Sequence, residues 1–333
     1  MSQISQAEIS DAYAGRRVLI TGASGFIGLN LTAALHAAKA QVCVLGRSGL
    51  PAPRSINLML DEANCFRGDI RDSAVVERAV TGCELVFHLA GKSGAVASNA
   101  SPLADLDVNG RGTLTLLEAC RRMSPSPKVV FPSSRLVYSP DLTGPVSETS
   151  PTVPLSVYGI HKLMAERYLL LYQRLYGLRV SVLRITNPYG PFQRPEQSRY
   201  GIVNWFIHQA IHGRPLTIYG HGAQLRDYIH VDDVVQAMLL AGIKAEADGR
   251  LLNVGSSRGV SFVDMAELIV RNTGRGSLEH VDWPTDAAGV ETGDFVADVS
   301  LIKACLGWSG SVPIEVGIAD VIGRYGKFAP TEP

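Results

Sequence analysis

Three side chains of this sequence could act together in proton transfer: Ser134, Tyr158 and Lys162. Tyr158 and Lys162 are four residues apart in a segment, 157–176, that predicts a helix, so both face the same side. Ser134 follows an apolar run, 128–132, that predicts a buried strand. A Tyr-x-x-x-Lys spacing arises by chance in many helices, so its meaning depends on the elements that position it.

A phenol can act as a general acid or base near neutral pH only if its pKa is lowered. A free tyrosine titrates at about 10, so a shift of about 3 units, or about 4 kcal/mol, is needed. One ammonium at ~4 Å with an effective dielectric of 20 supplies about that much. We therefore expect Lys162 to lower the pKa of Tyr158, and Ser134 to hydrogen-bond a developing oxyanion.

A glycine-rich turn near the start of the chain predicts a nucleotide site. Residues 18–20 predict a buried strand, and the turn after them carries three glycines at intervals of three: Gly22, Gly25 and Gly28. The first permits a tight turn, the second lets the backbone approach a pyrophosphate, and the third lets the next helix, expected at 26–40, pack closely. A second apolar strand completes a βαβ unit, so a diphosphate is expected at the start of the helix.

The residues at the end of the second strand indicate which of the two nicotinamide dinucleotides, NAD or NADP, would bind. An acidic residue about 20 residues past the glycines usually holds a free 2′-hydroxyl. Here Gly46 stands at that place, followed by Arg47 and Ser48. Arg47 can pair with a 2′-phosphate, which favours NADP over NAD. A solvated surface arginine is the alternative.

Two later strand ends also carry polar residues. Asp69 could accept a hydrogen bond from an adenine amino group or cap the next expected helix, 73–80. Residues 85–91 predict a fourth buried strand, and the small residues at its end would let a ribose pass over the sheet edge. His88 lies inside that apolar run and is expected to be a core histidine rather than a base or ligand.

Composition excludes several classes of protein. The 333 residues, 46% of them hydrophobic, are enough for one large core and a smaller lobe. A net charge of zero disfavours nucleic acid, and no run of eighteen apolar residues is present to cross a membrane. The five cysteines lack paired spacing, which favours free thiols in a reducing cytoplasm. His208 and His212 lack an acidic third ligand, so no metal site is expected.

Together these features resemble the extended short-chain dehydrogenase/reductase family, in particular its nucleotide-sugar epimerases, dehydratases and reductases. The resemblance covers about 18–308. Its motifs, in the family's order, are residues 21–28, 68–72, 87–91, 109–113, 133–134 with 137–138, 158–162, 184–191, 219–233 and 253–255. Each motif alone is common, but the ordered set is specific.

The resemblance implies an α/β fold: a Rossmann-type doubly wound parallel sheet with a smaller C-terminal substrate-binding lobe. After a flexible N-terminal tail at 1–15, residues 16–185 would form the dinucleotide-binding domain with the catalytic residues. Residues 186–330 would mainly form the nucleotide-sugar-binding lobe, with 228–256 returning to the Rossmann domain. In relatives two helices of the first domain pair with their copies, so a homodimer is expected.

The family pattern also assigns roles to single residues. The catalytic residues it implies are Ser134, Tyr158 and Lys162. The residues expected to contact NAD(P) are Gly22, Gly25, Phe26, Ile27, Gly28, Arg47, Ser48, Asp69, Ile70, Leu89, Ala90, Gly91, Lys92, Asn109, Tyr158 and Lys162. The residues expected to contact the nucleoside-diphosphate sugar are Ser93, Ser134, Asn187, Asn204, Tyr219 and Arg226. Arg226 would bind the diphosphate, with an ion pair to Asp227 or Asp232 as the alternative.

Four positions depart from the family pattern. Many relatives complete the diphosphate clamp with an arginine where this chain has Glu291. A carboxylate repels a diphosphate, so that loop would swing away or the substrate would be held differently. His221 replaces the usual acidic residue after Tyr219-Gly220. Arg135 and Leu136 replace the acid pair of the sugar 4,6-dehydratases, which disfavours dehydration.

Two reactions would share this site. If a keto-sugar intermediate rotates and takes the hydride back on its other face, the protein is an epimerase, with C4 as the expected centre. If the product leaves after one transfer, it is an NADPH-dependent 4-keto-sugar reductase. The missing dehydratase pair favours the epimerase and Arg47 favours the reductase; we favour the epimerase. A non-catalytic NADP(H)-sensing regulatory protein is a distant alternative, because both Tyr158 and Lys162 are present.

Overall fold

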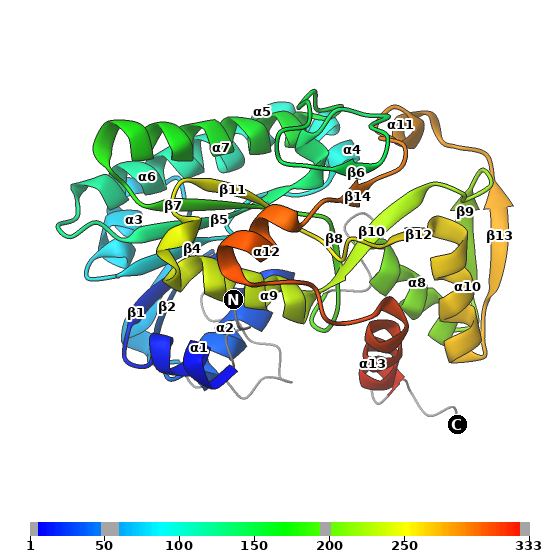
Figure 1. The fold of residues 1–333 in the computed structure, drawn as a ribbon, viewed down its shortest axis with the longest axis horizontal. Helices are drawn as coiled ribbons and strands as arrows, with labels where there is room; N and C mark the ends of the chain where they lie inside the picture. The colour runs from blue at the N-terminus through cyan, green and yellow to red at the C-terminus, as the bar shows by residue number, and fades with distance from the viewer. Residues whose placement is uncertain (1–5, 48–59, 194–200, 327–333) are drawn as a thin grey trace.

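The computed structural model describes residues 6–47, 60–193 and 201–326. Its largest element is a seven-stranded parallel sheet (Figure 1). In spatial order the strands are β11 (Arg250–Val254), β7 (Val180–Ile185), β5 (Lys128–Ser134), β4 (Leu85–His88), β1 (Arg17–Thr21), β2 (Gln41–Gly46) and β3 (Cys65–Arg67). The chain order reverses between β1 and β4, as in a doubly wound sheet. The predicted Rossmann-type fold is confirmed.

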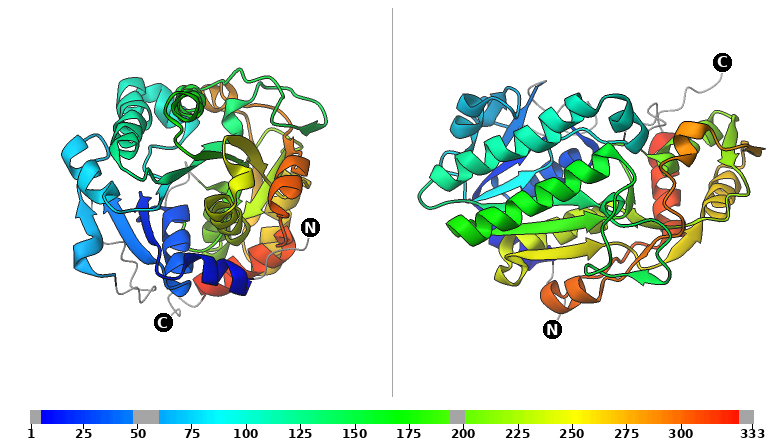
Figure 2. Two further views of the ribbon diagram at one scale, coloured as in Figure 1. Left: turned by 60° about the vertical axis from the view of Figure 1, so that its left-hand side comes forward. Right: turned by 90° about the horizontal axis from the view of Figure 1, so that it is seen from above.

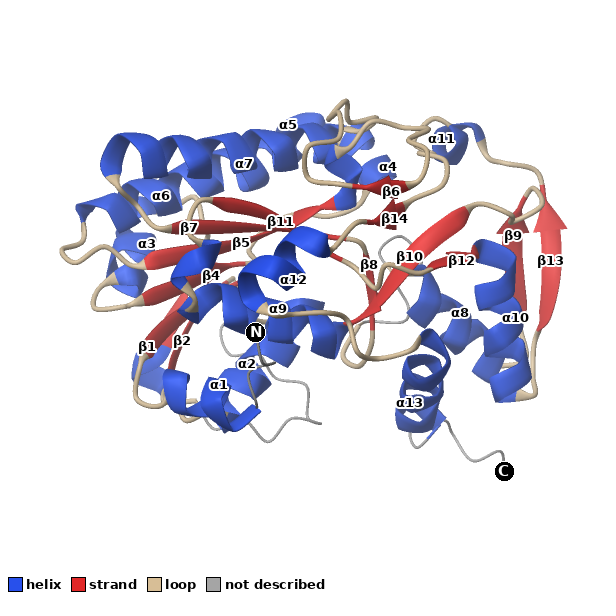
Figure 3. Cartoon of the chain, in the orientation of Figure 1, coloured by secondary structure: helices blue, strands red, loops and turns tan. Residues whose placement is uncertain are grey.

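Helices cover both faces of this sheet (Figures 1 and 3), because its central strands are buried on both sides. One face carries α3 (Ser73–Val80), α6 (Gly112–Arg122) and α7 (Val157–Tyr176). The other carries α1 (Gln6–Tyr13), α2 (Phe26–Ala37), α9 (Val231–Ile243) and α12 (Ser300–Leu306). Each layer encloses its own apolar cluster, so the carboxyl ends of the strands project from a packed scaffold.

A smaller lobe begins where β7 ends, beyond the carboxyl edge of the main sheet (Figure 2). Its two sheets contain β12 (Gly259–Ser261), β10 (Leu225–His230) and β8 (Asn187–Tyr189) in one, and β13 (Ser277–Val281) and β9 (Pro215–Tyr219) in the other. Around them α8 (Ile202–Ile211), α10 (Phe262–Thr273) and α13 (Ile314–Gly326) enclose a third apolar cluster. Between β10 and β12 the chain returns to the main sheet as α9 and β11, but the proposed domain boundaries stay a prediction.

The remaining described elements are short. They are β6 (Pro145–Val146) paired with β14 (Val296–Ala297), α4 (Ala95–Ala100), α5 (Pro102–Asp105), the π-helical turn η2 (Leu106–Arg111), α11 (Thr285–Ala288), and the 3₁₀ turns η1 (Glu62–Asn64), η3 (Arg135–Val137) and η4 (Ala245–Ala247). In the described part of the chain, no helix has the length and apolar character needed to span a bilayer.

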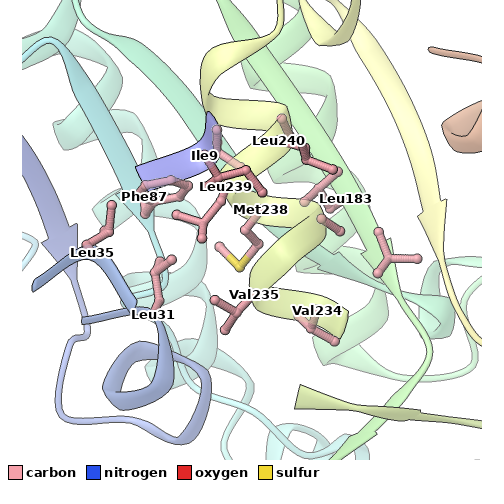
Figure 4. Close-up of a cluster of buried hydrophobic side chains, with 14 of the residues drawn as sticks. Ile9, Leu31, Leu35, Phe87, Leu183, Val234, Val235, Met238, Leu239 and Leu240 are labelled. Atoms are coloured by element: carbon pink, nitrogen blue, oxygen red, sulfur yellow. The ribbon is translucent and has the colours of Figure 1, made fainter. Parts of the chain in front are cut away.

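The N-terminal segment departs from the expected frayed tail. Residues 6–13 form the helix α1, and its Ile9, shown in Figure 4, is buried in the cluster that α2 and α9 build. Tyr13 of the same helix is buried in this cluster as well. The Tyr13 hydroxyl donates to the Leu239 carbonyl oxygen over 2.7 Å. The prediction is wrong for this stretch because two apolar residues four apart suffice to anchor an otherwise polar helix by one face.

Candidate active site

The glycine turn between β1 and α2 has the shape that a bound diphosphate needs. Gly22 has a φ of +73°, and a Cβ there would lie 2.7 Å from the Ala90 backbone nitrogen. A Cβ on Gly28 would lie 2.4 Å from the Gly22 oxygen, so this glycine permits the close packing of α2. Gly25 is the exposed N-cap of α2 and has no side-chain oxygen. The N–H groups in the first turn, among them those of Phe26 and Ile27, therefore donate no hydrogen bond to a capping side chain. This cradle therefore fits the diphosphate of a dinucleotide.

At the ends of β2 and β3 only part of the expected set is described. Gly46 is the last residue of β2 and Arg47 is exposed beyond it, whereas Ser48 lies outside the described residues. Asp69 accepts two hydrogen bonds from the Arg71 guanidinium, and these bonds hold the pKa of Asp69 near about 2. The proposed capping role of Asp69 is wrong, because the Asp72 side chain caps α3 instead.

Beyond β4, one asparagine organises the backbone that would border the cofactor. Asn109 accepts from the Lys92 N–H (2.9 Å) and donates to the Lys92 carbonyl oxygen (3.1 Å). It thereby holds the exposed loop of Gly91, Lys92 and Ser93 in place. Leu89 and Ala90, which precede this loop, are half-buried. Ile70 is buried in the apolar cluster on the sheet face that carries α3, α6 and α7.

His88 is confirmed as a core histidine. It is 1% exposed and hydrogen-bonded to the hydroxyls of Thr21 and Thr113. Burial first, and then the positive charge of Lys162, lower its pKa to about 3. An imidazole of this kind stays neutral at physiological pH and does not compete for the role of base.

Tyr158 and Ser134 are brought together by a close approach of α7 to the end of β5. A Cβ on Gly159 would lie 2.3 Å from the Leu136 carbonyl oxygen, so only glycine lets this helix start lie here. The start of α7 is fixed by Ser156, its N-cap, and by Ser98, whose hydroxyl accepts from the Tyr158 N–H over 2.9 Å. The Ser134 hydroxyl accepts from Leu136 N–H and also interacts with the Tyr158 phenol.

Lys162 lies on the same side of α7 as Tyr158, but its ammonium does not act as expected. Its Nζ donates to the Pro132 carbonyl oxygen over 2.8 Å and lies 5.8 Å from the centre of the Tyr158 ring. Burial lowers the pKa of Lys162 to about 8 and raises the pKa of Tyr158 to about 12. The expected lowering of the Tyr158 pKa by Lys162 is not found in the structure: burial raises this pKa most, the Asp105 carboxylate adds to the rise, and the hydrogen bond with Ser134 opposes it.

A buried network beneath this pair was missed by the sequence reasoning. His161, next to Lys162 on α7, contacts the buried Asp105 carboxylate over 2.6 Å, and the same oxygen accepts from Asn109. Asp105 is the last residue of α5, and none of the sequence motifs includes it. The network connects the start of α7 to the loop that Asn109 holds.

In the lobe, Arg226 has a different partner from either expected one. It is 7% exposed, forms an ion pair with Glu291 and donates to the Gly293 carbonyl oxygen over 2.7 Å. Asp227 instead accepts backbone N–H groups, including that of Ala297, so the alternative pairing is wrong. Glu291 faces the arginine, and its loop does not swing away.

The remaining predicted substrate residues lie in unlike surroundings. Asn187 is half-buried, and its side chain donates to the Asp227 carbonyl oxygen. Tyr219 packs against Trp283 with 5.3 Å between ring centres, a partner that no motif had indicated. Asn204 is fully buried, and its amide bonds the Gly190 backbone and the Tyr325 hydroxyl. A substrate contact from Asn204 would have to break these bonds.

His208 in α8 and His212, the residue after its end, are the pair for which no metal site was expected. The ring of His212 contacts the carbonyl oxygen of His208, and their ring centres are 4.4 Å apart. Within the residues that the structure describes, no group of three or more His, Cys, Asp or Glu side chains is arranged to hold a metal ion.

Comparison with known proteins places this geometry in a family. Residues 18–255 match the model of the NAD dependent epimerase/dehydratase family. A putative UDP-glucose 4-epimerase of Methanocaldococcus jannaschii is 31% identical over 307 residues, which cover 92% of this chain and 97% of that protein.

Solved structures give the same result. The UDP-glucose 4-epimerase of Thermotoga maritima, determined with UDP-glucose, has a TM-score of 0.84 at 30% identity, covering 94% of this chain and 99% of that one. The UDP-glucuronic acid 4-epimerase of Bacillus cereus, in complex with UDP-glucuronic acid and NAD, has a TM-score of 0.82 at 26% identity, with the same coverage. The chain is therefore an enzyme of the NAD-dependent epimerase/dehydratase family, the nucleotide-sugar branch of the extended short-chain dehydrogenases/reductases.

Proposed function

We propose that this enzyme inverts C4 of a nucleoside-diphosphate sugar by reversible hydride transfer, with Tyr158 as the acid and base. The observation that carries this proposal is the contact of Tyr158 with Ser134 at the end of β5, made possible by Gly159. Arg135 and Leu136 follow Ser134 where a dehydratase would carry acids, so no second acid–base pair is present there to eliminate water. The 4-epimerases among its relatives support the same reaction.

In this mechanism Ser134 orients the sugar hydroxyl and Tyr158 takes its proton. Bringing the pKa of Tyr158 from about 12 to near 7 requires about 7 kcal/mol of electrostatic stabilisation. One ammonium at ~4 Å supplies about 4 kcal/mol, so Lys162 would provide only part of it. NAD, when bound, accepts and returns the hydride, and its oxidised ring adds positive charge. Lys162 would also hold the cofactor with the ammonium that now bonds Pro132.

The alternative function is an NADPH-dependent 4-keto-sugar reductase, and the feature that favours it is Arg47 after Gly46. The NAD-bound relative gives no support for NADP. If Arg47 binds a 2′-phosphate, Arg47→Gln would weaken NADP binding at least tenfold and leave NAD binding unchanged. Equal affinities of the variant and the wild type for NADP, measured by fluorescence titration, would leave Arg47 as a solvated surface residue.

The test of function is a panel of nucleotide sugars followed by proton NMR. UDP-glucose, UDP-glucuronate and UDP-N-acetylglucosamine are incubated with the enzyme and NAD without added reductant. The proposal expects one of them to reach a mixture of C4 epimers with no net change in absorbance at 340 nm. A parallel incubation contains NADPH and a nucleoside-diphosphate 4-keto sugar. Stoichiometric consumption of NADPH there, with no C4 inversion of any sugar in the NAD panel, would favour the reductase.

We also propose a homodimer in the cytoplasm. Large apolar side chains are exposed along α5 and α7, among them Leu103 (77%), Ile160 (52%) and Leu175 (55%). A second copy of the chain could cover this face. All five cysteines are free, which suits a reducing compartment. Light scattering at micromolar concentration would give twice the 35.7 kDa chain mass, and Ile160→Lys would halve it.

A further inference from the structure

Two arginine side chains lie beside the loop of residues 291–293, and among the described residues only one of them, Arg226, forms an ion pair with a carboxylate. Arg226 forms an ion pair with Glu291. Arg135 donates from Nε to the Asn187 amide oxygen (3.2 Å) and from its terminal nitrogen to the Thr292 hydroxyl (2.8 Å). Among the described residues no carboxylate forms an ion pair with Arg135.

The surroundings of Arg135 make a missing counter-ion costly. The side chain is half-buried and lies over the Phe295 ring, 5.5 Å from its centre. Burial and the positive charge of Arg226 lower the pKa of Arg135. The other carboxylate nearby, Asp227, is occupied by backbone N–H groups, including that of Ser256. A guanidinium kept in such a place needs an anion to offset its desolvation.

The direction of Arg135 indicates which part of a substrate it would meet. The residue follows Ser134, but its donors reach away toward the lobe, to Asn187 and Thr292. Its guanidinium therefore lies near that of Arg226, which contacts the same loop through Glu291 and Gly293. Two neighbouring guanidinium groups suit an anion with several oxygens and two charges.

We propose that Arg135 and Arg226 form a two-arginine clamp for the diphosphate of the substrate, with Glu291 as an internal counter-ion that the diphosphate displaces from Arg226. This inference rests on the proposed nucleotide-sugar substrate. Together the three side chains carry one net positive charge, and without Glu291 they would carry two. The clamp explains how a chain with Glu291 in this loop can still bind a diphosphate.

The test is the affinity for a nucleoside diphosphate without its sugar, measured by calorimetry on the whole enzyme with NAD. UDP is the first probe, with dTDP and GDP beside it. Arg135→Met is expected to raise the Kd of the diphosphate that binds by tenfold or more, whereas Arg135→Lys should lose less. The matched control is Arg271→Met on α10, where the side chain is 66% exposed; it should leave the Kd unchanged.

Several outcomes would overturn the clamp. One is a Kd within twofold of the wild type for Arg135→Met. Another is a loss confined to UDP-glucuronate with UDP unaffected, which would assign Arg135 to a sugar carboxylate. A third is a wild-type enzyme that binds none of the three diphosphates. Because no turnover is measured, a clamp dependent on Arg135 would stand even if C4 inversion were not found.

Glu291 gives an independent test with the opposite sign. Glu291→Gln keeps the oxygen that accepts the Thr292 and Gly293 N–H groups but removes the charge that competes with the diphosphate. The Kd for the bound diphosphate is expected to fall severalfold. In the Arg135→Met background, Glu291→Arg should recover most of the lost affinity. An unchanged or higher Kd for Glu291→Gln would contradict the counter-ion role.

Discussion

The two halves of the candidate site are held by different kinds of contact. In the Rossmann half, backbone approaches set the geometry: Gly22 against Ala90, and Gly159 against Leu136. In the lobe, side chains from distant segments set it, as in the pair of Arg226 with Glu291. The first kind of contact leaves no room for a side chain, whereas the second could exchange one ion pair for another. We therefore propose that the chemistry and the binding of the diphosphate belong to separate parts of the structure.

The sharpest way to test the Rossmann half is Tyr158→Phe. Loss of the phenolic hydroxyl is expected to lower kcat on the order of 1000-fold, because no other acid or base is proposed at that position. The Kd for NAD should stay within about twofold, since the ring and the start of α7 remain. Stopped assays with the best nucleotide sugar and a separate cofactor titration give the two numbers. An equal loss of both would mean a folding defect and not a missing base.

The next effect concerns the cost of burying Lys162. Its pKa is lowered to about 8 in the folded state by burial, against 10.5 for the ordinary side chain. Below pH 8 the Lys162 amine is protonated in both the folded and the unfolded protein, and the free-energy cost of burying its charge is fully present. As the pH rises from 8 to 10.5, Lys162 loses its proton in the folded protein first, and this cost disappears. The free energy of unfolding should therefore rise over this window, relative to Lys162→Met, by about 3 kcal/mol. Urea titrations at pH 7.5 and 10 measure the difference, and parallel curves would contradict it.

Gly159→Ala tests the backbone contact that brings Tyr158 to Ser134. The added Cβ would lie 2.3 Å from the Leu136 oxygen, so α7 must shift, at a cost of about 2 kcal/mol in stability. The rate should fall as well, because the phenol moves. The matched control is Gly323→Ala in α13, where no atom lies within 4 Å of the new Cβ. That control should leave the free energy of unfolding unchanged or raise it by up to about 1 kcal/mol. Similar losses of stability and rate in both variants would contradict a specific role for the contact between Gly159 and Leu136.

Asn204→Ala addresses the lobe and should have the smallest effect. It leaves the Gly190 backbone groups without their partners, which costs about 1–3 kcal/mol. If the residue is structural, thermal unfolding shifts while the Kd for UDP stays the same at a temperature where the variant is folded. A Kd raised tenfold with an unchanged melting temperature would return Asn204 to the substrate contacts.

The contrast between local backbone contacts and side-chain contacts from distant segments also explains what could be predicted from the sequence. The doubly wound sheet and the bounds of α7 followed from local patterns, because strand periodicity and a glycine C-cap act over a few residues. The partner of Arg226 did not, since Glu291 is 65 residues away and had been expected to repel the substrate. The role of Arg135 also depends on a contact across 157 residues, to Thr292. The field at Tyr158 was misjudged because spacing shows that Lys162 shares its face but not where the ammonium points.

The most direct test of the central claim follows a deuterium label. The nucleotide sugar that reacts best in the panel is prepared with deuterium at C4 and converted by the enzyme in ordinary water. If the hydride leaves and returns at one carbon beside Tyr158, the epimer carries the deuterium at C4 in full. Deuterium lost to water, or recovered only in released reduced cofactor, would contradict the account.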